Sequence, residues 1–257
     1  MLTAEKIRAI HEIVDGAKVG IVFQPIADIH RRRILAYEAL ARNSNSLFKS
    51  TPEIFEAAVQ AGRVAELGRL HRDQAVKLCP HYPLFLNIEP HEFDHGWLVR
   101  PDDPMFRHRH PITLEITESV PIKYFTQCHS VLAEIRQKGV SLAIDDLGAG
   151  FSNLKYIADL QPEIVKLDRE LILGCAPGNR PFRLLCSIVS LTHNPQPSHS
   201  QRRRLSASIS SIARRTSRRS TPASLQAWNS SSPSSSSMIM MPPPSANRQR
   251  VPRACDS

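Results

Sequence analysis

Glycine is missing from the last quarter of this sequence, because all ten glycines lie before residue 194. Lysine is missing from the same stretch, and Asp256 is its single acidic residue. What remains there is ten arginines in a run rich in serine and proline, without a strand-like apolar segment. Such a composition buries too little apolar surface to offset the entropy of ordering the chain. We expect residues 194–257 to be a disordered basic tail behind a folded domain, 1–193.

The positive charge belongs to that tail. The chain carries a formal net charge of +9, but residues 1–193 hold 23 basic and 23 acidic residues and are therefore neutral. A folded domain without excess charge gives no electrostatic reason to bind nucleic acid. We expect nucleic-acid binding only as a non-specific, salt-sensitive property of the tail.

Paired cysteines and long apolar runs are also missing. The five cysteines are odd in number, and no two form a C-x-x-C motif. This argues against a disulfide framework or a zinc ribbon and favours a reducing compartment. No apolar run approaches the ~20 residues of a membrane span, and the charged start "MLTAEKIRAIHEIV" does not resemble a signal peptide. We expect a cytoplasmic protein without a membrane partner.

Short β-rich runs alternate with helical patterns from residue 19 to residue 193. Strands are expected at 19–26, 33–40, 83–88, 112–117, 140–146 and 163–168. Helices are expected at 51–79, 124–139, 153–160 and 181–193. The alternation predicts an α/β fold with a parallel sheet, and the arginine run 31–33 indicates a hairpin tip. A closed eight-stranded barrel would need about two more strand–helix units.

The change of composition after Thr192 has two possible explanations. One is a natural disordered tail that binds RNA or an acidic surface. The other is a change of reading frame, so that a continuing domain is translated out of register. The break falls inside a helical pattern with no linker before it, which favours the frame change. Sequencing the gene across the His193 codon separates the two.

Polar side chains lie at or near the carboxyl ends of the predicted strands, where functional residues of α/β barrels are found. They are Glu38, Asn87, Glu115, Asp145, Asp146, Lys166 and Asp168. Taken singly, each could be a solvated loop residue or an ion-pair partner. Carboxylate and amide oxygens that meet at one barrel mouth form a hard-cation site, suited to Mg²⁺ or Mn²⁺. Two such ions about 4 Å apart would suit phosphoryl chemistry.

Six ordered motifs carry a family resemblance. The segments are FQPI, YEALAR, LFLNIEP, LEITES and IDDLGAGFSNLKYIADLQPEIVKLDRELI, the last of which holds two motifs. They resemble the EAL domain, the cyclic di-GMP phosphodiesterase family, whose signature tripeptide is Glu38-Ala39-Leu40 here. The resemblance spans about residues 5–193. It implies a TIM-like (β/α) barrel that binds cyclic di-GMP and opens it to linear pGpG with divalent cations.

The resemblance also implies roles at the metal centre. Glu38, Asn87, Glu115 and Asp145 would hold a first Mg²⁺ or Mn²⁺ ion, and Asp146 would join Asp145 at a second. Lys166 would hydrogen-bond the attacking water and polarise it. The catalytic residues would accordingly be Glu38, Asp146 and Lys166.

Further roles concern the nucleotide and a loop. Gln24, Arg42 and Asp168 would contact cyclic di-GMP. Glu118 would brace the loop after the fifth strand, in which Gly148 and Gly150 allow tight turns. In the family this region also takes part in dimerisation, so a homodimer through residues 146–153 is expected.

The chain departs from the family pattern mildly in this loop, at Leu147, Ala149 and Phe151, and strongly at its end. The family continues with a seventh strand carrying a glutamate in E-G-V-E, and with a Q-G motif on an eighth. Neither occurs after Thr192. We therefore expect a six-stranded, incomplete barrel with impaired activity. The alternative is an inactive remnant that serves as a nucleotide-binding or interaction module.

A second motif, HEFDH at 91–95, matches the H-E-x-x-H pattern of zinc proteases. That chemistry needs a helix of several turns and a third ligand. Pro90 precedes the motif and Gly96 follows it, so we expect a very short helix and surface histidines instead of a zinc site.

Overall fold

The structure is a computed structural model that describes residues 3–28, 31–43, 45–117, 125–147, 160–168, 172, 175–176 and 178–192. The chain divides into two compact units, Met1–Lys166 and Leu167–Ser257. Several predictions fall outside the described residues: the tail 194–257, the loop residues Glu118, Gly148 and Gly150, and nearly all of the helix expected at 153–160. The domain boundary at residue 193 therefore stays a prediction.

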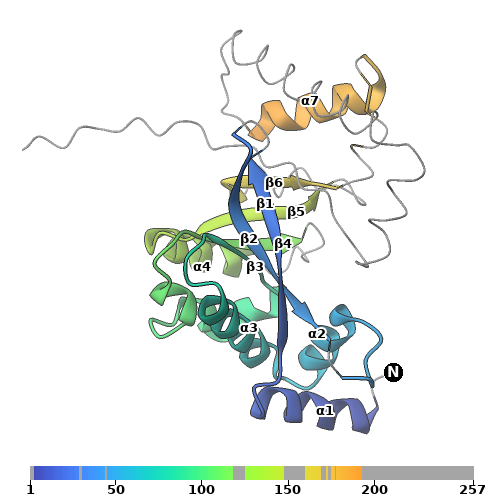
Figure 1. Cartoon of the computed structure of the whole chain (residues 1–257), viewed down its shortest axis with the longest axis vertical. Coiled ribbons are helices and arrows are strands. Elements are labelled where there is room, and N and C mark those ends of the chain that lie inside the picture. Colours follow the sequence, from blue (N-terminus) through green and yellow to red (C-terminus); the bar gives the residue numbers. More distant parts are fainter. Residues whose placement is uncertain are drawn as a thin grey trace, which may run out of the picture. The chain divides into compact units, whose positions relative to one another are not determined.

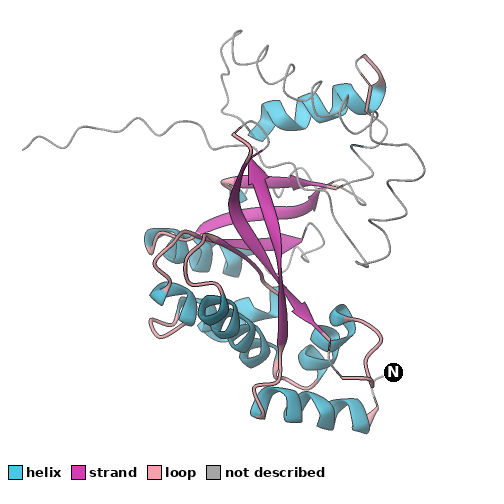
Figure 2. Cartoon of the chain, in the orientation of Figure 1, coloured by secondary structure: helices cyan, strands magenta, loops and turns pink. Residues whose placement is uncertain are grey.

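Strands and helices alternate along the described chain (Figures 1 and 2). The strands are β1 (Gly20–Asp28), β2 (Arg33–Arg42), β3 (Leu84–Asn87), β4 (Ile112–Thr117), β5 (Ser141–Leu147) and β6 (Ile164–Leu167). The α-helices are α1 (Ala4–Asp15), α2 (Thr51–Gln60), α3 (Val64–Leu78), α4 (Phe125–Gln137) and α7 (Arg180–Thr192), and η1 (Pro90–Val99) and η2 (Pro104–Arg107) are 3₁₀-helices. No helix in the described ranges has the length and apolar content to cross a membrane.

The six strands form one sheet in the order of the sequence, β1 to β6. From β2 to β5 every neighbouring pair is parallel, as predicted. The pair β1–β2 is antiparallel, which agrees with the hairpin tip expected between these two strands, so the sheet is mixed at this edge. The cause is the hairpin tip expected at 31–33, where the Asp28 side chain accepts a hydrogen bond from the Arg31 backbone and Arg32 adopts a positive φ of 52°.

The helix predicted over 51–79 is two helices, α2 and α3. Ser50 caps α2, since its side chain accepts a hydrogen bond from the Glu53 backbone. The helix ends at Gln60, and two residues later Gly62 has a φ of +68°, the left-handed conformation that glycine adopts without steric cost. The break turns α3 so that it packs against β1 and β3.

Apolar side chains fill the space between helices and sheet. In β4, Ile112, Leu114 and Ile116 are buried on one face. Thr113 and Glu115, on the opposite face, are also buried, and burial on both faces is typical of parallel strands in barrels. A second apolar cluster joins α1, α2 and α3. The described residues thus form an incomplete TIM-like barrel of six strands, as the sequence predicted.

Candidate metal centre

Strand register places four polar side chains on one face of the sheet. Asn87 pairs with Glu115, while Glu38 pairs with the residue two positions before Asn87. Glu115 in turn pairs with the residue two positions before Asp145. Side chains on a strand alternate between faces, so residues in register or two apart point to the same side. Glu38, Asn87, Glu115 and Asp145 therefore share a face.

Three carboxylates from this row meet. One oxygen from each of Glu38, Glu115 and Asp145 lies within 4.8 Å of the others, the single group of this kind among the described residues. The three residues are buried, with 7%, 1% and 7% of their surfaces exposed. Water cannot shield their mutual repulsion at such depth, so the group requires a cation.

Lys166 of β6 supplies one positive charge to these carboxylates. Its Nζ lies 2.6 Å from Glu115 Oε1, 2.8 Å from Asp145 Oδ2 and 3.3 Å from Glu38 Oε2. Burial alone would lower the pKa of Lys166, but the three carboxylates, Glu115 first, raise that pKa above its ordinary value. The ammonium therefore stays protonated at neutral pH. The sequence led us to expect that Lys166 would hydrogen-bond the attacking water. Its direct contact with the three carboxylates is a feature that the sequence did not indicate.

Glu115 is the least satisfied member of the group. Burial raises its pKa well above the usual range; the charge of Lys166 opposes this shift, and Glu38 and Asp145 reinforce it. Although Lys166 is close, neither Glu115 oxygen receives a hydrogen bond of normal geometry from the described residues. Three carboxylates and one ammonium leave an excess of two negative charges when all are ionised.

These donors fit a divalent cation. Carboxylate oxygens with an amide nearby are the ligands that Mg²⁺ and Mn²⁺ prefer. The Asn87 amide lies beside the group, with its Nδ2 at 3.5 Å from Glu38 Oε1, and it would turn its oxygen toward a bound ion. The buried Glu115 oxygens without donors, together with the charge excess, are what a second positive group would satisfy.

Asp146 has an unusual backbone conformation beside this group. Its φ is +53°, in the left-handed region that few residues other than glycine adopt, although aspartate is enriched there. Its backbone N–H donates to Asp145 Oδ1 at 2.8 Å, which orients that carboxylate. The group of three carboxylates does not include the half-buried Asp146 side chain.

The residues predicted to contact nucleotide lie at different places. Gln24 of β1 pairs directly with Glu38 across the antiparallel ladder and is half-buried. Arg42 ends β2 four residues after Glu38, on the same face, and is exposed. Asp168 follows β6 and is half-buried, but it belongs to the second unit.

The HEFDH segment forms the 3₁₀-helix η1, which spans ten residues and is longer than predicted. In a 3₁₀-helix, residues three apart share a face, so the four-residue spacing of a zinc protease does not align the two histidines. Glu92 is fully buried and pairs with Arg72 of α3 at 2.5 Å. A glutamate held in this way cannot act as the base of a zinc protease.

Comparison with known proteins agrees with this geometry. The family model described as the EAL domain matches residues 8–197. The uncharacterized protein y4lL of Sinorhizobium fredii is 31% identical over 72% of this chain and 24% of its own length. The probable cyclic di-GMP phosphodiesterase PdeI of Escherichia coli is 27% identical over 63% of this chain and 23% of its own. The chain thus spans about a quarter of the length of these curated relatives.

Solved structures agree on the fold. The PaMucR phosphodiesterase in complex with c-di-GMP has a TM-score of 0.62 over 82% of this chain and 92% of that one, at 19% identity, which shows the fold alone. Klebsiella pneumoniae BlrP1, solved with manganese and cyclic di-GMP, has a TM-score of 0.55 at 28% identity over 66% of this chain and 45% of that one. Family model, relatives and fold agree with the motifs around Glu38, and the chain belongs to the EAL domain family.

Proposed function

We propose that this EAL domain hydrolyses cyclic di-GMP to linear pGpG with Mg²⁺ or Mn²⁺, at a rate below that of relatives with a complete barrel. One observation carries the proposal: Glu38, Glu115 and Asp145, from three different strands, meet around the single ammonium of Lys166, and within the described residues the Glu115 oxygens accept no hydrogen bond of normal geometry. The choice of cyclic di-GMP as the substrate rests on relatives whose names state cyclic di-GMP phosphodiesterase activity. The setting would be cytoplasmic second-messenger signalling in a bacterium, by a dimer formed through residues 146–153.

The chain offers ligands for two ions. Glu38, Asn87, Glu115 and Asp145 would hold the first, and Asp145 with Asp146 the second. Divalent cations, when bound, supply positive charge that stabilises the phosphodiester transition state and favours ionisation of water. The hydrogen bond from the Asp146 backbone to Asp145 Oδ1 would keep Asp145 oriented for this role.

Lys166 would orient the attacking water. Because the carboxylates keep its ammonium protonated, it donates hydrogen bonds and does not act as a base. Arg42, exposed at the end of β2, would pair with the phosphodiester, since a guanidinium binds phosphate oxygens strongly. Gln24 and Asp168 would contact the nucleotide.

A low rate follows from the residues after 193. They contain no glutamate and no glycine, and so neither the E-G-V-E nor the Q-G stretch of the family. The same observation favours a second candidate, an inactive domain that still binds nucleotide. In either case the metal ligands on β2 to β5 would be retained.

Hydrolysis by the purified chain tests the proposal. Cyclic di-GMP is incubated with Mn²⁺, Mg²⁺ or EDTA, and pGpG is measured by chromatography. We expect slow, metal-dependent formation of pGpG that Glu38→Ala abolishes. Glu134→Ala is a matched control, because Glu134 is an exposed glutamate of α4 that pairs with Lys138.

Two other outcomes change the conclusion. Binding of cyclic di-GMP without any pGpG, in wild type as in Glu38→Ala, would establish the inactive module. A rate as high as that of a complete EAL phosphodiesterase would refute the expected impairment.

A further inference from the structure

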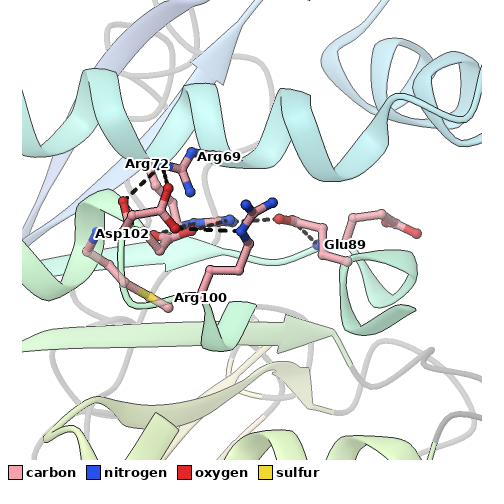
Figure 3. A network of polar contacts seen from close by, with 8 residues as sticks. Arg69, Arg72, Glu89, Arg100 and Asp102 are labelled. Atoms are coloured by element: carbon pink, nitrogen blue, oxygen red, sulfur yellow. Dashed lines mark hydrogen bonds and ion pairs between the residues drawn. The ribbon is translucent and has the colours of Figure 1, made fainter. Parts of the chain in front are cut away.

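A second cluster of buried charges lies between α3 and the segment that joins β3 to β4 (Figure 3). Arg72 of α3 is fully buried. Its Nη1 lies 2.5 Å from Glu92 Oε2, and its Nη2 lies 2.9 Å from Asp103 Oδ2. Its Nε donates to both Asp103 oxygens at 3.2 Å. A single guanidinium thus holds two carboxylates that are eleven residues apart in sequence.

Glu92 connects Arg72 to the turn at the end of β3. Its second oxygen, Oε1, accepts a hydrogen bond from the Glu89 backbone N–H at 3.1 Å. Glu89 is the N-cap of η1, two residues after Asn87. Between them, the Ile88 backbone N–H donates to the Glu115 carbonyl at 2.9 Å. One ion pair and one hydrogen bond therefore connect Arg72 with the turn that follows Asn87.

Close packing leaves Glu92 no space to move toward the helix. Gly68 lies one turn before Arg72 on α3, and a Cβ atom at Gly68 would overlap the Glu92 carboxylate. Glu92 is itself fully buried. The carboxylate is therefore confined between the α3 backbone, the guanidinium and the Glu89 N–H.

We propose that Glu92, held by Arg72, is a positioning residue that fixes the turn after β3 so that the Asn87 amide faces the three carboxylates. The proposal rests on the proposed function in one respect, that Asn87 is a metal ligand. Groups that orient metal ligands commonly change metal affinity by about 10–100-fold when they are replaced. Glu92 would act in this way through two residues of backbone.

The decisive measurement is the Mn²⁺ affinity of folded protein, by calorimetric titration of Glu92→Gln and Asp103→Asn. Glutamine retains the size of Glu92 but has one acceptor oxygen, so it can satisfy Arg72 or the Glu89 N–H but not both. Asp103→Asn is the matched control, because Asp103 is equally buried and bound to the same Arg72, but caps η2 through the Met105 backbone. We expect Glu92→Gln to weaken Mn²⁺ binding about tenfold or more, and Asp103→Asn to change it by less than about twofold, with similar losses of thermal stability in both.

A steric variant covers the case in which Glu92→Gln does not fold. Gly68→Ala displaces the Glu92 carboxylate without removing any charge, and alanine is a better helix former than glycine. We expect the same weakening of Mn²⁺ binding. Affinities like wild type in both Glu92→Gln and Gly68→Ala, or in Gly68→Ala alone if Glu92→Gln is unfolded, would overturn the proposal.

A readout without metal separates this proposal from the proposed function. The side-chain amide of Asn87 is observed by NMR in ¹⁵N-asparagine-labelled protein with EDTA. We expect its signals to shift in Gly68→Ala and Glu92→Gln and to stay in place in Asp103→Asn. If wild type bound no Mn²⁺, the metal site would fail, but a shifted Asn87 signal would still support positioning by Glu92. An unshifted signal would refute it.

Discussion

Two buried clusters in this domain hold similar charges and satisfy them differently. In the first, Arg72 binds Glu92 and Asp103, and every carboxylate oxygen accepts a hydrogen bond from the guanidinium or from the backbone. In the second, Lys166 lies among Glu38, Glu115 and Asp145, and in the described parts of the chain neither Glu115 oxygen accepts a hydrogen bond of normal geometry, although Lys166 forms an ion pair with one of them. All the charged residues of both clusters are buried, so burial alone does not distinguish the clusters.

The difference follows from the chemistry of the two bases. A guanidinium presents five donors in a planar fork, which suits two carboxylates at once. An ammonium has three donors and cannot satisfy six carboxylate oxygens. A buried cluster with all its donors and acceptors paired contributes to the fold, whereas one that retains excess charge loses stability until a cation binds. Incomplete pairing, more than depth or acidity, therefore indicates the ligand site.

The largest expected loss of unfolding free energy comes from replacing the basic residue of either cluster, Arg72 or Lys166. Arg72→Met leaves Glu92 and Asp103 buried without a positively charged partner, which should cost about 3–5 kcal/mol of unfolding free energy. Lys166→Met should cost a comparable amount in EDTA. Mn²⁺ should restore stability to Lys166→Met alone, because that cluster alone can take a cation in place of the ammonium. Urea denaturation with and without Mn²⁺ measures both.

One outcome of the comparison between Arg72→Met and Lys166→Met would contradict the prediction. If Mn²⁺ stabilised Arg72→Met as much as Lys166→Met, the ion would be binding elsewhere, and the distinction between the clusters would be lost. Glu134→Ala provides the baseline for an exposed charge, which should change stability by about 0.5 kcal/mol or less.

The next largest expected effect is a loss of unfolding free energy at acidic pH. It arises from His71, the residue before Arg72. Burial, together with the charge of Arg72, lowers the pKa of His71 to about 4, although a hydrogen bond with the Ala39 backbone opposes the shift. A histidine whose folded pKa is below its unfolded value of 6.5 contributes stability above pH 6.5 that is lost as the pH falls toward 4. The loss should approach roughly 3 kcal/mol.

The variant His71→Gln retains a hydrogen-bond donor and removes this titration. Denaturation of wild type and variant between pH 7 and pH 4 should show the free-energy difference shrinking or reversing as acid is added. If the difference in unfolding free energy between wild type and His71→Gln stayed constant over this range, protonation of His71 would not destabilise the folded protein. The assigned direction of its pKa shift would then be wrong.

The sequence predicted the strands and their polar ends because both depend on local patterns. The strand at 112–117 has the predicted bounds, and the row of ligands follows from alternation along successive strands. The antiparallel first pair was indicated only by the hairpin signal at 31–33, because strand–helix alternation by itself predicts parallel pairing. The break at Gly62 was missed because glycine is also tolerated inside helices.

The buried pairs could not be predicted from local patterns. Arg72 is 20 residues from Glu92 and 31 from Asp103, and in sequence each resembles an ordinary surface charge. Glu92 was moreover part of a zinc-protease pattern that its burial now excludes. For Lys166, the motif indicated a functional residue, but its contact with three carboxylates depends on how β6 joins the sheet, which no spacing reveals.

The smallest expected effect is the most specific to the ligand cluster, and it has the opposite sign to that of His71. A carboxyl whose pKa is raised by folding, as that of Glu115 is, costs stability once the pH exceeds its unfolded pKa of 4.5. Glu115→Gln removes this cost while Lys166 keeps Asp145 and Glu38 as partners. In EDTA at pH 8 the variant should be more stable than wild type by about 1–2 kcal/mol, the usual range for a buried unsatisfied group.

Two conditions should reduce or reverse the stability advantage of Glu115→Gln. At pH 4.5 the gain should shrink, because wild-type Glu115 becomes protonated and neutral in the folded protein. In Mn²⁺ wild type should become more stable while Glu115→Gln gains little, since ligand binding stabilises only the protein that binds. A variant less stable than wild type in EDTA at pH 8 would show that Lys166 fully compensates Glu115. In that case the ligand cluster would be as complete as the Arg72 cluster, and a charge deficit could no longer be the reason that it binds a cation.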